Sequence, residues 1–357
     1  MQPDQDTSLA ATVDAPPGWR SRFDSRNMLG WEAGLAVVVI AIGILGVSTS
    51  SEFLTGNNIF NLGLQSGEIA IMALPMTLII ISGEIDLSVA SIMGMSSALL
   101  GYLWGKHWPM LVIFLVILLV GVLAGAINGL LITRLGLPSL AVTIGTLGLY
   151  RGVANIILGP NTISNFPASY ANIGVTGVFN SNLSFSAAVF IVLAVLFGVV
   201  LHFTPVGRSI YAMGASPEAA TFAGIRVKRI KTVLYIVSGV ICSLAGVLLT
   251  FRLSTSVNTN GLGLELDVVA VVLLGGVSIF GGKGTIVGVV LGVLAFAGIQ
   301  NALLLTSFNQ EAASIPVGGL LLVSVFVPNI ATLTRRIRGV IARRGKAAPS
   351  AVGAGHD

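Results

Sequence analysis

Charge is scarce in this sequence. Only 9% of its 357 residues are Asp, Glu, Lys or Arg, whereas a soluble domain carries about 25%. Hydrophobic residues make up 54% of the chain, and the mean hydropathy is +0.94. So few charges do not cover a water-exposed surface, which excludes an ordinary soluble protein. The composition therefore predicts an integral membrane protein whose surface mostly faces lipid.

Cysteine and histidine are also rare. Cys242 is the single cysteine and lies inside an apolar run, so an internal disulfide is excluded and we interpret it as a packing residue. None of the three histidines stands at metal-ligand spacing from it. Neither a His cluster nor an activated Ser or Cys lies near the end of an apolar run, which disfavours an integral-membrane enzyme. We expect no catalytic residue, metal or cofactor in this chain.

Long apolar runs, in contrast, are abundant. A helix needs about 20 apolar residues to span a bilayer, and fewer where it is broken or re-entrant. We predict an all-α polytopic fold of about ten transmembrane helices, with a short interfacial helix at 54–66. The first span is expected to be retained, because no cleavage site typical of a signal peptide follows it. The predicted spans are 31–49, 67–82, 84–102, 110–133, 137–158, 185–203, 230–251, 266–280, 285–305 and 313–331.

The basic residues divide unequally between the two sides of this arrangement. With the N-terminus in the cytoplasm, all but three of the 19 Lys and Arg residues fall inside, and only Lys106, Arg151 and Arg252 fall outside. The positive-inside rule therefore places both termini in the cytoplasm, and the distribution favours membrane orientation over nucleic-acid binding. The predicted parts are a polar tail over 1–30, a transmembrane domain over 31–331 with an outer loop at 159–184 and an inner loop at 204–229, and a basic tail over 332–357.

Two pairs of segments suggest an internal repeat. EIDL at 84–87 is similar to ELDV at 265–268, and INGLL at 127–131 is similar to QNALL at 300–304. Both pairs match a span with the one five spans later. Because five is odd, the copies enter the membrane from opposite sides. The pattern predicts two inverted-topology halves, as in many transporters.

The inner loop contains a short helix with clear ends. Ser216 is a good N-cap, Pro217 suits the first helical position, Glu218 stands in the first turn and Gly224 can end the helix. Such a helix between basic segments is either a docking element for a soluble partner or an ordinary loop helix. The run EAA at 218–220 followed by Gly224 resembles the EAA-x-x-x-G coupling helix in permeases of ATP-binding cassette (ABC) importers.

Further segments resemble the sugar-type branch of those permeases. ISGEIDLSVAS at 81–91 is similar to its G-G-I-D-L-S-V-G-S signature, and the glycine-rich run at 275–285 agrees as well. The resemblance covers most of the chain. The sequence departs from the pattern at Glu84, where Gly is common, at Ala90, which replaces the second Gly, and at Pro75 in the second span.

The resemblance implies a permease subunit that moves a small hydroxylated solute across the bacterial inner membrane. The solute would be a monosaccharide such as ribose, xylose or rhamnose, or autoinducer-2. The implied partners are a second permease, identical or different, two cytoplasmic ATPase subunits that bind the ATP, and an extracytoplasmic solute-binding protein. The implied coupling-helix residues are Pro217, Glu218, Ala219, Ala220 and Gly224.

Carboxylates precede two of the predicted spans. In one interpretation they sit near the interface, where helix N-termini stabilise negative charge by about 0.3–1 kcal/mol. In the other they line the pathway or its gate, because acids inside a membrane are commonly functional. The candidate pathway residues are Glu84, Asp86, Asn128, Glu265, Asp267 and Asn301. The glycines expected to permit tight turns between helices are Gly275, Gly276, Gly281 and Gly282.

Two alternative functions remain open, and a third is disfavoured. An ion-coupled secondary transporter would explain an inverted repeat but not the helix at 217–224. A branched-chain amino acid permease is a cousin within the same superfamily. The run Gly282-Lys283-Gly284 suggests a P-loop, but Gly284 stands where that motif needs Ser or Thr, so ATP binding by this chain is not expected.

Overall fold

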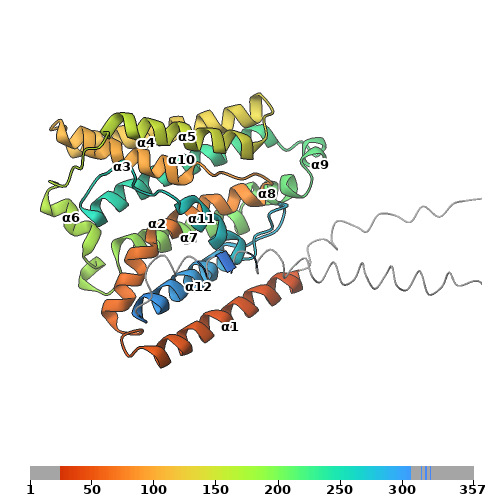
Figure 1. Cartoon of the computed structure of the whole chain (residues 1–357). Coiled ribbons are helices and arrows are strands. Elements are labelled where there is room, and N and C mark those ends of the chain that lie inside the picture. Colours follow the sequence, from red (N-terminus) through yellow and green to blue (C-terminus); the bar gives the residue numbers. More distant parts are fainter. Residues whose placement is uncertain (1–24, 307–314, 316–317, 320–321, 323–357) are drawn as a thin grey trace, which may run out of the picture.

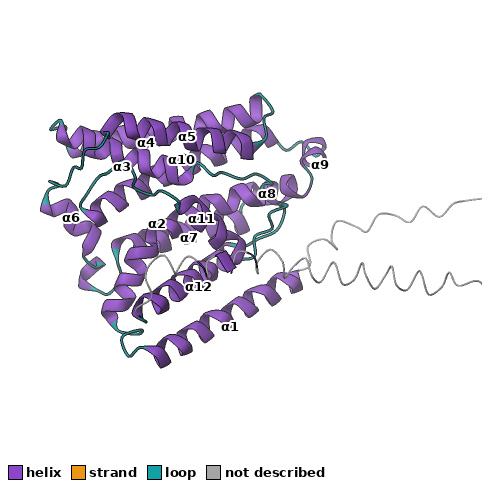
Figure 2. Cartoon of the chain, viewed as in Figure 1, coloured by secondary structure: helices purple, strands orange, loops and turns teal. Residues whose placement is uncertain are grey.

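The protein is described by a computed structural model over residues 25–306, 315, 318–319 and 322 (Figure 1). Within that part, the regular elements are helices, and extended pairing is limited to two isolated bridges, Ile163 with Ser256 and Gly177 with Ser184 (Figure 2). The helices are α1 (Ser25–Thr49), α2 (Gly56–Ile81), α3 (Val89–Gly105), α4 (Met110–Arg134), α5 (Ser139–Leu158), α6 (Ala168–Val175), α7 (Phe185–Phe203), α8 (Pro205–Ala215), α9 (Pro217–Phe222), α10 (Val227–Leu253), α11 (Leu264–Leu274) and α12 (Ile286–Leu305), with a 3-10 turn at Val178–Asn180.

Helix α2 lies at the centre of the bundle. Nearly all of its apolar stretch is buried, and α7, α10, α11 and α12 pack around it. Helices α4 and α5 cover α3 and α10 on one side, whereas α1 lies on the opposite side against α12 (Figure 1). Most of the surface of α1, α4, α5 and α7 is exposed and apolar, as expected for helices that face lipid.

The prediction of ten spans is not confirmed. Seven of the described helices are long and apolar enough to cross a membrane. Predicted span 84–102 corresponds to the shorter α3, and 266–280 corresponds to the 11-residue α11, which ends at Leu274. The prediction of a separate interfacial helix at 54–66 was wrong. Thr55 caps a single continuous helix, α2, that includes most of this segment. Span 313–331 and the basic tail lie almost wholly outside the described residues, as does most of the N-terminal tail.

Three helices end in the same backbone motif with a glycine at its left-handed position. At α2, the amide of Gly83 donates to Ile80 and that of Glu84 donates to Ile79. This pair of bonds, with Gly83 at a φ of +84°, is a Schellman motif. Helices α9 and α11 end in the same way, with Gly224 and Gly276 at the left-handed position. Each motif stops its helix sharply and sets the direction of the chain that follows.

The bundle has two distinguishable ends, which we call the α6 end and the α9 end (Figure 1). Helix α1 is tied to the rest at the α9 end. Its Trp31 indole Nε1 donates to the carbonyl of Leu274 at 3.2 Å, and its Glu32 carboxylate accepts a hydrogen bond from Thr285. An exposed helix is therefore held by the end of α11 and the start of α12.

Candidate functional site

Helix α9 forms where the local sequence predicts it. The Ser216 hydroxyl oxygen accepts a hydrogen bond from the amide of Ala219 at 3.2 Å, and Pro217 takes the first helical position. Gly224, with a φ of +83°, closes the helix. These local signals fix both ends of a six-residue helix that would not be stable alone.

Helix α9 projects from the α9 end of the bundle. The Phe222 side chain is 93% exposed, and Glu218 and Ala219 are exposed beside it. Ala220 is the buried residue of the helix. A large exposed aromatic side chain next to a carboxylate is typical of a protein–protein contact surface.

The end of α8, just before α9, contacts two other turns at very short range. A Cβ atom at Gly214 would lie 1.8 Å from the carbonyl oxygen of Ile81 and 2.6 Å from the amide of Gly282. The amide of Gly282 donates to that same Ile81 carbonyl at 2.8 Å. Gly281 in turn packs on Gly83. We call Gly83, Gly214, Gly281 and Gly282 the glycine junction.

The glycine junction connects α8 and α9 to the ends of two other helices. It joins them to the end of α2 and to the turn at 275–285 between α11 and α12. The Tyr211 hydroxyl on α8 also donates to the carbonyl of Gly284 at 2.6 Å. Burial, together with Glu32, raises the pKa of Tyr211 to about 12, so it remains a donor at neutral pH. Because backbone touches backbone here, the end of α8 cannot move toward either turn without displacing it.

The predicted turn glycines lie in close contact with neighbouring backbone or side chains. A Cβ at Gly275 would meet the backbone of Val289 at 2.6 Å, and one at Gly276 would overlap the Trp31 ring. Gly281 and Gly282 adopt φ values of +79° and +72°, which disfavour any other residue. These glycines therefore permit close packing of α11 on α12 and of the 275–285 turn on α8.

Asp86 is the most buried of the candidate carboxylates. It follows the α2 turn and accepts hydrogen bonds from the amide and hydroxyl of Ser88, at 3.0 and 2.6 Å, and from Ser238 of α10 at 3.2 Å. The Asn128 amide on α4 donates to Ser88 at 2.8 Å, and the Tyr150 hydroxyl on α5 donates to Asn128 at 3.3 Å. Asp86 and Asn128 thus belong to one network that connects four helices.

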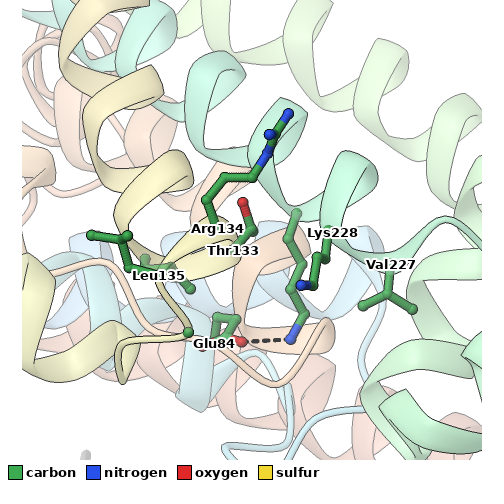
Figure 3. A pocket seen from close by; sticks show the side chains of 9 residues that line it. Glu84, Thr133, Arg134, Leu135, Val227 and Lys228 are labelled. Atoms are coloured by element: carbon green, nitrogen blue, oxygen red, sulfur yellow. Dashed lines mark hydrogen bonds and ion pairs between the residues drawn. The ribbon is translucent and has the colours of Figure 1, made fainter.

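Glu84 lies apart from that network at the edge of a pocket. Its carboxylate pairs with the Lys231 ammonium of α10 at 2.5 Å (Figure 3). The pocket, about 250 Å³ in volume, opens between the end of α4 and the start of α10. Thr133 and Arg134 line one side of it and Lys228 lines the other.

The remaining candidate pathway residues lie elsewhere. Glu265 and Asp267 stand in the first turn of α11 and are half-buried, and Glu265 interacts electrostatically with Arg151 of α5. Asn301 on α12 forms a reciprocal amide pair with Asn58 on α2, at 2.7 and 2.9 Å. The six residues therefore do not line one shared cavity.

Several polar ties near the α6 end were missed by sequence reasoning. Buried Glu68 on α2 pairs with Arg252 on α10 at 3.0 Å. The Arg151 guanidinium donates to the carbonyl of Asn260 at 2.8 Å. The available sequence signal for Glu68 was that an acidic residue stands just inside a predicted span, where charged side chains are usually paired. No sequence signal identified its partner, which lies 184 positions away.

Metal-ligand geometry is not found in the described residues, where no three His, Cys, Asp or Glu side chains lie together. What the arrangement offers instead is mechanical. The end of α8, next to the exposed helix α9, makes backbone contacts with the turns at the ends of α2 and α11. Those turns also carry or adjoin Glu84 and Asp86.

Comparisons with known proteins agree with one another. The family described as "Branched-chain amino acid transport system / permease component" matches residues 58–325. The ribose import permease protein of Bacillus subtilis is 37% identical over 86% of this chain and 95% of its own length. The D-allose transport system permease protein of Escherichia coli is 32% identical, over 81% and 88%. The autoinducer 2 import system permease protein of E. coli is 31% identical, over 89% and 98%. No solved structure matches the chain significantly.

Proposed function

The chain belongs to the branched-chain amino acid transport system permease family, as a sugar-type ABC importer permease, and from this premise we propose how it works. We propose that it conducts a small hydroxylated solute across the bacterial inner membrane, driven by a separate ATPase. The solute is a monosaccharide such as ribose, xylose or rhamnose, or autoinducer-2. The relatives named for ribose, allose and autoinducer 2 support this class over the branched-chain amino acids in the family's description.

One observation carries the coupling mechanism. Helix α9 is exposed, and the end of α8 that directly precedes it rests on the end of α2 and on the 275–285 turn. We assign Pro217, Glu218, Ala219, Ala220 and Gly224 to the element that docks on the ATPase. When the ATPase subunits close, α9 moves and pushes Gly214 against the Ile81 carbonyl and the Gly282 amide. The push reorients α2 with α3, and α11 with α12, which alternates access.

The pathway is assigned to the two short helices and their flanks. Asp86 precedes α3, and both Asp86 and Asn128 bond to Ser88 at the start of that helix. Glu265 and Asp267 lie in the first turn of α11. Short helices flanked by acids are typical of solute sites in transporters built from two halves. We propose that α3 and α11 are counterparts in two inverted halves, and that Asn301 corresponds to Asn128.

The charge distribution supports an orientation. Seven described Lys and Arg residues lie at the α9 end or in the adjoining inner loop, and they are Arg134, Arg208, Arg226, Lys228, Arg229, Lys231 and Lys283. We propose that this end faces the cytoplasm and that both termini lie there too. The 31–331 transmembrane domain would then carry the α6 loop on the outside. A solute-binding protein would dock there, and a second permease would complete the pathway within the bilayer.

A co-purification experiment tests the coupling role. A tagged chain is co-expressed with its ATPase subunit, and the amount of ATPase retained is measured for the wild type, Glu218→Arg and Phe222→Ala. Each variant is expected to lose at least about tenfold of the retained ATPase, because both remove exposed contact groups. Phe179→Ala, which removes an equally exposed ring from the α6–α7 loop, is the matched control and is expected to retain it.

Transport by the reconstituted chain tests the energy source. Uptake of a labelled monosaccharide into vesicles should require the ATPase, ATP and the binding protein, and should persist when a protonophore collapses the ion gradient. Uptake without any ATPase, abolished by the protonophore, would establish the ion-coupled alternative instead.

A further inference from the structure

The exposed face of α4 forms a continuous apolar stripe that ends in a charge. Its large side chains recur every three or four residues, so they form a row that winds through about 160° of the helix surface. Each is between 43% and 72% exposed. The next position in this row, four residues after Leu130, is the exposed Arg134 at the end of the helix. The stripe consists of Leu111, Leu115, Leu119, Leu123, Ile127 and Leu130.

Arg134 lines the pocket that also contains Glu84. Three cations and one carboxylate surround this pocket, which leaves an excess of two positive charges. Lys231 is occupied by Glu84. In the described part of the chain, neither Arg134 nor Lys228 has a carboxylate partner. Figure 3 shows Lys228 next to the Glu84 ion pair and Arg134 farther along the rim, with its guanidinium directed away from that pair.

The start of α10 adds to the positive potential. Helix α10 begins at Val227, which lines the same pocket, and its N-cap Arg226 makes no side-chain capping bond. The amide of Val227 donates to Ile225 and that of Ile230 donates to Arg226. The amides of Lys228 and Arg229 therefore remain as donors in the first turn, and the helix dipole favours an anion there. The pocket thus combines two unpaired cations with free amide donors.

We propose that this pocket binds the phosphate headgroup of an anionic phospholipid, whose acyl chains lie along the α4 stripe. The Arg134 guanidinium and the Lys228 ammonium bind the phosphate oxygens, and Lys231 is kept in place by Glu84. The apolar stripe that ends at the pocket is what favours a lipid over free phosphate. The proposal requires that α4 faces the bilayer and does not depend on which solute the chain carries.

The site lies close to the coupling machinery. Glu84 directly follows Gly83 of the glycine junction, and Lys228 lies in the chain that leads from α9 into α10. A bound headgroup would join the end of α4 to the start of α10 next to the elements that α9 moves. Anionic lipid is therefore expected to stabilise the chain specifically at this place.

Lipid titration of the full-length chain tests the proposal. The delipidated protein in neutral detergent is titrated with phosphatidylglycerol or phosphatidylcholine, while native mass spectrometry counts bound lipid and a thermal ramp gives the unfolding midpoint. Phosphatidylglycerol is expected to bind and to raise the midpoint by several degrees, whereas phosphatidylcholine is not. In Arg134→Gln/Lys228→Gln the apparent affinity for phosphatidylglycerol should fall at least about tenfold.

Controls separate the pocket from general surface charge. Arg208→Gln/Arg229→Gln removes the same charge from two exposed positions that do not line the pocket, and should bind phosphatidylglycerol as the wild type does. The single variants Arg134→Gln and Lys228→Gln alter exposed side chains and provide the test if the double variant does not fold. Equal stabilisation by inorganic phosphate alone would show a free-anion site and overturn the proposal. Unchanged affinity in the pocket variants, or equal loss in the controls, would overturn it as well.

Discussion

Both ends of the helix bundle contain polar side-chain contacts, but the α9 end also has the close backbone packing of the glycine junction. At the α9 end, backbone packs on backbone through the glycine junction. At the α6 end, side chains form directional polar ties, including Glu68 with Arg252 and Asn58 with Asn301. Backbone packing tolerates sliding and tilting while it transmits displacement, whereas a buried ion pair or amide pair holds one geometry. Under the coupling mechanism that we propose, the bundle is pushed at the α9 end and held at the α6 end.

The largest expected effect comes from breaking the buried ion pair at the α6 end. Arg252→Gln leaves the Glu68 carboxylate buried without its partner, which typically costs about 3–5 kcal/mol. Thermal unfolding of the purified chain measures the loss. Glu68→Gln/Arg252→Gln removes both charges and should recover most of it. A double variant as unstable as the single one would contradict this explanation.

The next effect comes from filling the glycine junction. Gly214→Ala places a methyl group 1.8 Å from the Ile81 carbonyl oxygen, so the turns must separate, at a cost of about 1–3 kcal/mol. Transport should be lost to a greater degree than stability, because the contact that transmits the push is displaced. Gly43→Ala on the exposed helix α1, where a Cβ meets nothing within 4 Å, is the control. Normal transport by Gly214→Ala would remove the junction from the mechanism.

A smaller loss is expected when the amide pair is cut. Asn301→Ala leaves the Asn58 side chain without its reciprocal partner, which costs about 1–3 kcal/mol for a buried polar group. Asn58 keeps its bond to the carbonyl of Phe53, so the value should fall near the lower end. A double-mutant cycle with Asn58→Ala measures the coupling, and a coupling energy of zero would show that the pair does not act as a tie.

The smallest effect measures how much the Glu84–Lys231 ion pair contributes at the α9 end. Glu84→Gln removes the charge but still accepts a hydrogen bond from Lys231, so the loss should be about 1 kcal/mol or less. That loss should shrink further at high salt, because the pocket is open to solvent. A loss comparable to that of Arg252→Gln would erase the contrast between the two ends.

Local signals predicted several of the long helices and the short helix α9 well. The spans at 110–133, 185–203 and 285–305 fall within a residue or two of α4, α7 and α12. Helix α9 was found because Ser216, Pro217 and Gly224 act on neighbours within a few residues. The caps of a helix are a property of its own sequence, so they can be read from it.

Long-range and broken features could not be predicted in the same way. The contact between Ile81, Gly214 and Gly282 joins residues more than 60 positions apart, and no periodicity encodes it. Apolar composition extended the predicted span 84–102 back to Glu84, although α3 begins at Val89, because hydropathy does not detect the turn that Gly83 makes. The same limitation applies to 266–280, where Gly275 and Gly276 end α11 early.

The Schellman stop at Gly83 has a consequence for how the gene can change length. Inserting one residue into α2 would carry Gly83 about 1.5 Å along the axis and about 100° around it, away from Gly281 and Gly214. The number of residues in α2 is thus fixed as strictly as their identity. The α4–α5 turn at Gly136, where a Cβ meets nothing within 4 Å, has no such phase to preserve. Natural insertions and engineered tags should accumulate there and be purged from α2.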